Sequence, residues 1–175
     1  MATTLRPTVV PSGPTEAKTP FVIRPARASD PEAMALIALH TGQMAEQSPE
    51  ESCHSLDSTG LDTLDVQFFL LWQDGRAIAM GALKALSGDA FELKSMHTRQ
   101  DARGCGAGRA MLDHLLAQAR HVNAGAIYLE TGSTDDFLPA RRLYESYGFV
   151  EVPLFEGYGP DVWSVFMRLE MHSAA

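Results

Sequence analysis

The chain has 175 residues and a formal net charge of -8 at pH 7, with 45% hydrophobic and 21% charged residues. This length and composition fit one globular domain with a hydrophobic core, which excludes fibrous and wholly disordered proteins. The negative charge repels the phosphates of nucleic acid, and no apolar run approaches the length of about 20 residues that a membrane span needs. Without a signal-peptide pattern, the expected location is cytoplasmic. The two cysteines, Cys53 and Cys105, follow no metal-ligand spacing and are expected to be free, so no metal is predicted.

The N-terminal part of the chain divides into a tail, a strand and a helix. Residues 1–20 are rich in Pro, Thr and Ser without a hydrophobic period, so we expect a disordered tail before a single domain over residues 21–172. A short strand is predicted at Phe21–Arg24. The capping-box spacing of Ser29 and Glu32, followed by apolar residues at helical spacing, predicts a helix. The long polar stretch that follows this helix is expected to be a functional loop.

The middle of the chain has the pattern of β-strands. Three apolar runs separated by short turn sequences predict an antiparallel meander. These runs are residues 66–72, 77–83 and 91–98, with turns at 74–75 and 87–89. In the third run Phe91 and Leu93 share one parity and Met96 has the other, as a β-bulge would produce.

A glycine-rich segment, Arg103-Gly104-Cys105-Gly106-Ala107-Gly108, follows the third run and leads into a helical stripe of apolar residues. Backbone N–H groups at such a helix start bind anions, because they lie at the positive end of the helix dipole. The spacing fits neither the P-loop, which needs Gly-Lys-Ser/Thr, nor the dinucleotide fingerprint G-x-G-x-x-G.

The C-terminal part predicts further elements in a regular order. A strand at 126–130 is expected to lie parallel to the third run, if the connection through the helix is right-handed. A helix is predicted from about residue 135 to Tyr147, closed by Gly148. Two last strands, at 149–155 and 162–169, are expected to pair with each other.

The glycine segment resembles the phosphate loop of the GCN5-related N-acetyltransferases, which has the form Arg/Gln-x-x-Gly-x-Gly/Ala and here reads Arg103-x-x-Gly106-x-Gly108. Residues 92–96 and 143–149 are similar to the family's fourth strand and last helix. The chain departs from the family at Phe137, where many members have Asn, so the cofactor contacts of that Asn are not carried over. The resemblance implies an α+β fold with a mixed sheet of about six to seven strands, mostly antiparallel with one parallel pair, and about four flanking helices.

The resemblance also implies an activity: direct transfer of an acetyl group from acetyl-CoA to a primary amine of a small molecule or peptide. Coenzyme A is then expected to contact the bulged strand and the glycine loop. These cofactor-binding residues are Met96, His97, Thr98, Arg103, Gly104, Cys105, Gly106, Ala107, Gly108 and Arg109. Tyr144 corresponds to the tyrosine that protonates the departing thiolate, which its ordinary pKa near 10 permits.

The acceptor side of the site is less defined by the sequence. Glu92 is the candidate general base, and His54 and Asp57 in the long polar loop are candidates to line the acceptor pocket. His97 is a further candidate for the base. Two other functions stay open: a homodimeric module that senses acetyl-CoA without transfer, and a nucleotide-binding protein.

Overall fold

One mixed β-sheet organises the described part of the chain, residues 20–47 and 57–171 of the computed structural model. In that part seven strands are hydrogen-bonded in the order β1-β2-β3-β4-β5-β7-β6. They are β1 (Val22–Pro25), β2 (Val66–Gln73), β3 (Arg76–Ala85), β4 (Ala90–Thr98), β5 (Ala126–Gly132), β6 (Val150–Val152) and β7 (Ser164–Glu170). Of these seven described strands, only β4 and β5 pair in parallel, which confirms the predicted mixed sheet with one parallel pair. Of the predicted tail, residues 1–19 lie outside the described residues.

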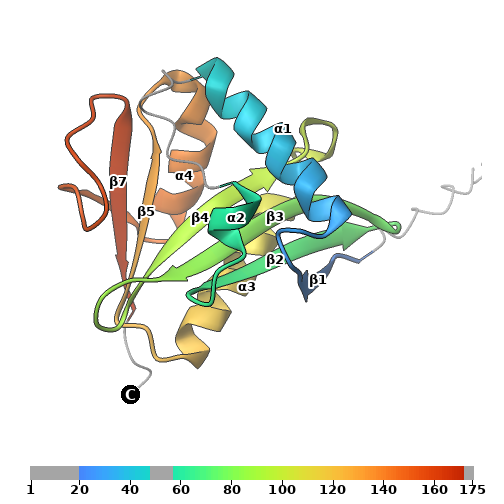
Figure 1. Ribbon diagram of the computed structural model, residues 1–175. Helices are drawn as coiled ribbons and strands as arrows, with labels where there is room; N and C mark the ends of the chain where they lie inside the picture. Colours follow the sequence, from blue (N-terminus) through green and yellow to red (C-terminus); the bar gives the residue numbers. More distant parts are fainter. Residues whose placement is uncertain (1–19, 48–56, 172–175) are drawn as a thin grey trace, which may run out of the picture.

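Four α-helices among the described residues cover the two faces of the sheet (Figure 1). They are α1 (Pro31–Gln47), α2 (Ser58–Leu61), α3 (Ala107–His121) and α4 (Leu138–Ser146), with 3-10 turns at Gln100–Ala102 and Asp135–Phe137. The first two lie on one face and α3 and α4 on the other. None of the helices in this part of the chain has the length and apolarity needed to cross a bilayer.

Two hydrophobic cores form because successive side chains of a strand point to opposite faces. The larger core joins the apolar stripe of α3, which includes Leu112 and Leu115, to Leu93 of β4 and Tyr144 of α4. The smaller core joins α1 to β2 and β3 and includes Met80. The sheet therefore separates an α3–α4 side from an α1–α2 side.

The predicted bulge lies in the second half of β4. Ala82 of β3 pairs with Lys94 and Met80 pairs with His97, so β4 has one residue more than β3 between these two pairs. Ser95 accommodates the extra residue with a left-handed backbone, φ 54°. The parity change that the sequence shows between Leu93 and Met96 is confirmed.

Pairing between β4 and β5 stops before either strand ends. Its last pair is Leu93 with Leu129, whereas β4 continues to Thr98 and β5 to Gly132. Beyond this point the two strands are not paired with each other, which leaves the edge of β4 at the bulge open toward β5. This separation is the space in which the site forms.

Near the C-terminus, β6 and β7 pair as predicted, but β6 is only three residues long rather than extending to Phe155. Pro153 follows it directly and has no N–H to continue the ladder, which explains the early end. The long polar loop contains the short helix α2 with Asp57 as its N-cap.

Two glycine-to-alanine substitutions are expected to change stability in opposite directions. A Cβ on Gly81 would meet Leu115 at 2.8 Å, the Met96 sulfur at 2.9 Å and Met111 at 3.0 Å, so Gly81→Ala is expected to destabilise by about 1–3 kcal/mol through overpacking. Gly42 lies within α1, and a Cβ at this position would have nothing within 4 Å, so Gly42→Ala is expected to stabilise by about 0.5–1 kcal/mol. Urea unfolding of both variants tests this, and equal signs would contradict it.

Candidate active site

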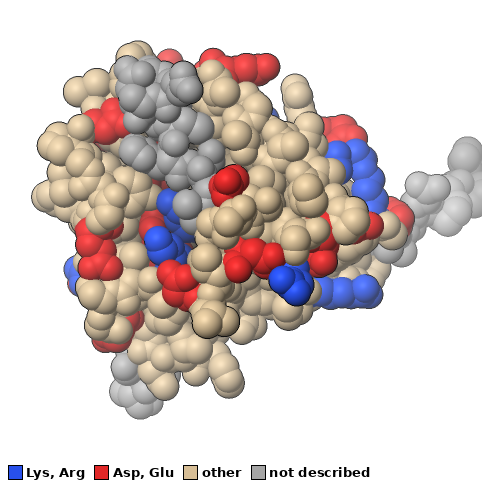
Figure 2. Space-filling model, in the orientation of Figure 1, with Lys and Arg blue, Asp and Glu red and all other residues tan. Residues whose placement is uncertain are grey.

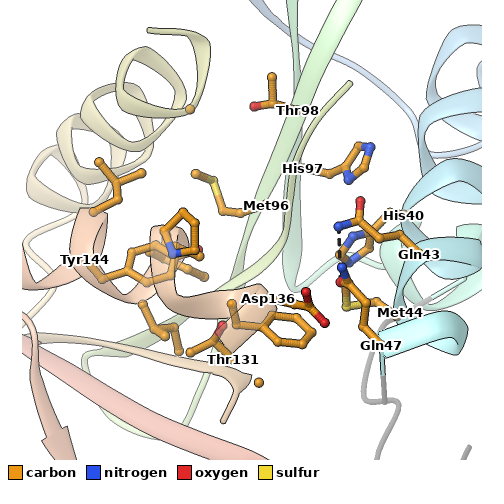
Figure 3. Close-up of a pocket in the computed structure, with 18 of the residues that line it drawn as sticks. His40, Gln43, Met44, Gln47, Met96, His97, Thr98, Thr131, Asp136 and Tyr144 are labelled. Carbon is orange, nitrogen blue, oxygen red and sulfur yellow. Dashed lines mark hydrogen bonds between the residues drawn. The ribbon is translucent and has the colours of Figure 1, made fainter. Parts of the chain in front are cut away.

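A pocket of about 370 Å³ lies where β4 and β5 separate. Side chains from α1, β4, β5 and α4 line it (Figure 3). Six residues that the sequence singled out meet there: Met96, His97, Thr98, Arg103, Gly108 and Tyr144. Residues far apart in the chain thus share one cavity at the open edge of the bulged strand.

The glycine loop has the backbone conformation that an anion site requires. Gly104 and Gly106 have φ of 76° and 96°, which side chains with a Cβ rarely adopt. Gly106 is the N-cap of α3 and has no side chain to cap the helix. The first helical hydrogen bond is donated by the N–H of Ala110 to the carbonyl oxygen of Gly106, at 3.0 Å. The N–H groups of the first turn therefore have no helical acceptor and are suited to phosphate oxygens.

The two arginines of this loop have different surroundings. Arg103 lines the pocket, and its guanidinium donates to the Gln43 side chain at 2.7 Å and to the Thr98 carbonyl at 3.3 Å. Arg109 does not line the pocket, and its guanidinium lies 5.3 Å from the centre of the Tyr147 ring. Only Arg103 thus connects the loop to the helix α1 on the other face of the sheet.

Tyr144 reaches the pocket from α4 and is almost fully buried, with 7% of its surface exposed. Burial raises the pKa of its hydroxyl far above the usual range, and the negative charge of Glu130 raises the pKa further. The hydroxyl is therefore protonated at neutral pH and can donate a proton to a stronger base.

Comparison with known proteins agrees with this geometry. The sequence model of the acetyltransferase (GNAT) family matches residues 27–149. The chain belongs to this family. It is 36% identical over 138 residues to the uncharacterized N-acetyltransferase YsnE of Bacillus subtilis, a match that covers 79% of this chain and 91% of YsnE. The protein is therefore an acyltransferase.

Solved structures show the same fold. A presumed acyl-CoA N-acyltransferase of Klebsiella pneumoniae superposes with a TM-score of 0.71 at 26% identity, covering 87% of this chain and 98% of that one. A GNAT acetyltransferase of Elizabethkingia anophelis, solved with acetyl-CoA bound, has a TM-score of 0.63 at 17% identity and covers 86% and 98% of the two chains.

Glu92 does not share the pocket of this acetyltransferase with Tyr144. It lies on β4 with 3% of its surface exposed, and its carboxylate accepts hydrogen bonds from the Tyr158 hydroxyl and, at 3.2 Å, from Lys94. Lys94 in turn donates to the Tyr158 oxygen at 2.7 Å. These three side chains line a second cavity of about 590 Å³ together with Glu156. The carboxylate is thus held in a buried network that fastens the loop between β6 and β7 to the sheet.

Asp57 and Cys105, which the structure describes, line neither cavity. Asp57 is exposed and caps α2, where its carboxylate accepts from the Gly60 N–H at 2.9 Å. Cys105 is a free thiol that donates to the Ala102 carbonyl at 2.8 Å. Cys53 and His54 fall outside the described residues.

Sequence reasoning missed the wall that α1 contributes, which consists of His40, Gln43, Met44 and Gln47. His40 falls on the apolar stripe of the predicted helix, and a polar residue in that stripe is the only sequence signal for it. On β5, Glu130, Thr131 and Gly132 also line the pocket, and the Phe137 ring would lie 2.2 Å from a Cβ on Gly132. Phe137 is the residue at which the sequence departs from the family pattern, and its ring covers Gly132.

His40 and His97 lie beside each other in the wall of the pocket, with ring centroids 5.3 Å apart. Each has 9% of its surface exposed. Burial, with a smaller effect of Lys94, lowers the pKa of His40 to about 4. Burial, followed by His40, Arg103 and Arg99, lowers the pKa of His97 to about 4. Both imidazoles are therefore uncharged at neutral pH.

These two histidines are expected to make the folded state acid-sensitive. The pKa of each histidine is lower in the folded chain than the value of 6.5 in the unfolded chain, so below pH 6.5 the unfolded chain binds more protons. The free energy of unfolding is therefore highest above pH 6.5 and decreases as the pH falls toward 4. The loss is on the order of 3 kcal/mol for one such histidine.

The double variant His40→Gln/His97→Gln should lose less stability than the wild type between about pH 7 and pH 5, measured by urea unfolding. His121→Gln, at an exposed position in the last turn of α3, is the control and should follow the wild type. The prediction is contradicted if the free energy of unfolding of the double variant changes with pH as steeply as that of the wild type.

Proposed function

We propose that this GNAT protein transfers an acetyl group directly from acetyl-CoA to a primary amine of a small molecule or peptide. The observation that carries the proposal is the arrangement around one pocket: a glycine loop suited to phosphate lies at one end, and the buried, protonated Tyr144 lines it. Acetyl-CoA supplies the activated acetyl group as a thioester, so the protein needs to bind, orient and exchange protons.

The residues present fit coenzyme A. The unpaired first-turn N–H groups of α3 after Gly104 and Gly106 are donors for its pyrophosphate, with Arg103 as the nearby cation. The edge of β4 at Met96 and Thr98 has no β5 partner, so its backbone can pair with the amide groups of the pantetheine arm as a strand would. This division of contacts supports Met96, Thr98, Arg103 and the glycines of the loop as predicted cofactor contacts.

Direct transfer requires no covalent enzyme intermediate. When donor and acceptor are held in attack geometry, much of the barrier is removed by positioning. Tyr144 is the proton donor for the departing sulfur. Burial raises its pKa, so its hydroxyl keeps its proton at neutral pH and can donate it as negative charge develops on the sulfur. The thiol of Cys105 takes no part, since it points to the Ala102 carbonyl.

The charges around the pocket favour an acceptor that arrives as a cation. Glu130 and Asp136 line the pocket, and the arginine that also lines it, Arg103, belongs to the loop proposed to bind the phosphates. The face that carries α1 and α2 shows more acidic than basic groups (Figure 2), in keeping with the net charge of -8. Such a field raises the local concentration of protonated amines.

Release of free thiol from acetyl-CoA tests the function across a panel of amino acids, polyamines, aminoglycosides and short peptides. Tyr144→Phe is expected to lower kcat by about 100-fold while acetyl-CoA binding is unchanged, because only the acid is removed. The matched control is Tyr147→Phe, since the Tyr147 hydroxyl donates to Asp113 and lies outside the pocket.

Three outcomes separate the alternatives. Turnover with one amine class that falls in Tyr144→Phe and not in Tyr147→Phe supports the transferase and its acid. Binding of acetyl-CoA without turnover of any amine favours the sensor. Stabilisation against heat by ATP or NAD but not by acetyl-CoA would favour a nucleotide-binding protein.

A further inference from the structure

The pocket is open to both faces of the sheet. Met96 packs against the core on the α3–α4 side, where Tyr144 also lies. His97 follows it directly and pairs with Met80, whose side chain belongs to the core beneath α1. Adjacent strand residues point to opposite faces, so His97 reaches the pocket from the α1–α2 side. Figure 3 shows Tyr144 on one side of Met96 and His97 with His40 on the other.

This arrangement assigns a side to each reactant of the proposed transfer. The glycine loop opens α3, so coenzyme A and its leaving sulfur belong with Tyr144 on the α3–α4 side. The acceptor amine is then left with the α1–α2 side, where His97, His40, Gln43 and Gln47 line the pocket. Direct transfer needs an acid beside the sulfur and a proton acceptor beside the amine.

We propose that His97 is the general base that takes the proton of the attacking amine, and that His40 is a positioning residue for it. The inference rests on the proposed acetyl transfer. Glu92 is not placed for this task, because it lines the other cavity and accepts hydrogen bonds from Lys94 and Tyr158.

Two further observations support the pair of histidines. Nδ1 of His40 is buried and has no hydrogen-bond partner among the described residues, although unsatisfied buried polar atoms are costly and often mark functional sites. Burial holds the pKa of both rings low, so each keeps a lone pair at neutral pH. The amine nitrogen becomes positively charged as it attacks, and it is then acidic enough to give its proton to a weak base.

Several charged groups face His97 and its neighbour. Arg103 and Arg99 lie on the side of the loop, and Lys94 acts on His40 from β4. Glu130 and Asp136 line the same pocket from β5 and the following turn. Asp136 is exposed at the rim, and the Glu130 carboxylate accepts a hydrogen bond from Ser164 at 2.7 Å. Glu130 and Asp136 are the alternative candidates for the general base, and the experiment must distinguish them from His97.

The proton and electron balance of the step is complete. The ammonium group first loses one proton to solvent, so the amine reacts in its neutral form. As its lone pair forms the C–N bond, His97 takes the second proton from nitrogen. The C–S bond breaks with its electron pair on sulfur, and Tyr144 gives its proton to that sulfur. His97 then loses its proton to solvent and Tyr144 regains one, so the enzyme returns to its first state.

The test compares two acceptors of nearly equal size and different basicity, ethylamine and trifluoroethylamine, at high concentration. His97→Gln is expected to lower kcat by about 100-fold with ethylamine and by less than about 10-fold with trifluoroethylamine, whose nitrogen gives up its proton more readily. His40→Gln should lower kcat with ethylamine by about 10-fold or less, and Glu130→Gln and Asp136→Asn should keep the wild-type ratio between the two amines.

Calorimetry of acetyl-CoA binding shows whether each variant is folded. If His97→Gln does not fold, His97→Asn replaces it in the same comparison. His121→Gln is the histidine control outside the pocket. If His97→Gln lowers kcat equally with both amines, or weakens acetyl-CoA binding instead of lowering turnover, His97 is not the base. The assignment also fails if Glu130→Gln or Asp136→Asn, and not His97→Gln, lowers kcat more with ethylamine than with trifluoroethylamine. A wild type that binds acetyl-CoA and acetylates no amine overturns the proposed function, and the base with it.

Discussion

The site depends on the point at which β4 and β5 stop pairing. Two parallel strands would normally continue their ladder, but after Leu93 and Leu129 the extra residue at Ser95 turns β4 away. The unpaired edge of β4 borders the resulting space, so backbone N–H and C=O groups as well as side chains are available there for hydrogen bonds. Tyr144, His97 and Arg103 all border this opening.

The two faces of the sheet carry the side chains that we propose for the two halves of the reaction. Strand alternation sends Met96 toward α3 and α4 and His97 toward α1, although they are neighbours in sequence. Acetyl transfer needs a proton acceptor beside the attacking nitrogen and a proton donor beside the departing sulfur, and the two faces of the opened sheet can supply these two groups separately. Arg103 joins the two sides, since it follows the bulged strand and hydrogen-bonds to Gln43 of α1.

Burial keeps the groups that line the pocket centre uncharged. It raises the pKa of Tyr144 and lowers the pKa of His97, which leaves a proton donor and a proton acceptor in their neutral forms. The buried charges of Glu92 and Lys94 are paired with each other beside Tyr158 in a separate cavity. An unpaired charge in that interior would be costly, so this network serves structure by securing the loop between β6 and β7.

The sequence by itself determined the order of the strands and of the helices apart from α2, the bulge near Met96, the glycine loop before α3 and the family. Those signals are local, because periodicity, turn residues and loop spacing depend on neighbours within a few positions. Only the tertiary structure decided that His40 lies beside His97 and that Glu92 is held by Tyr158, which is 66 residues away in the chain. Such pairs depend on which elements the sheet order brings together and on which face each side chain emerges, and no local pattern contains that information.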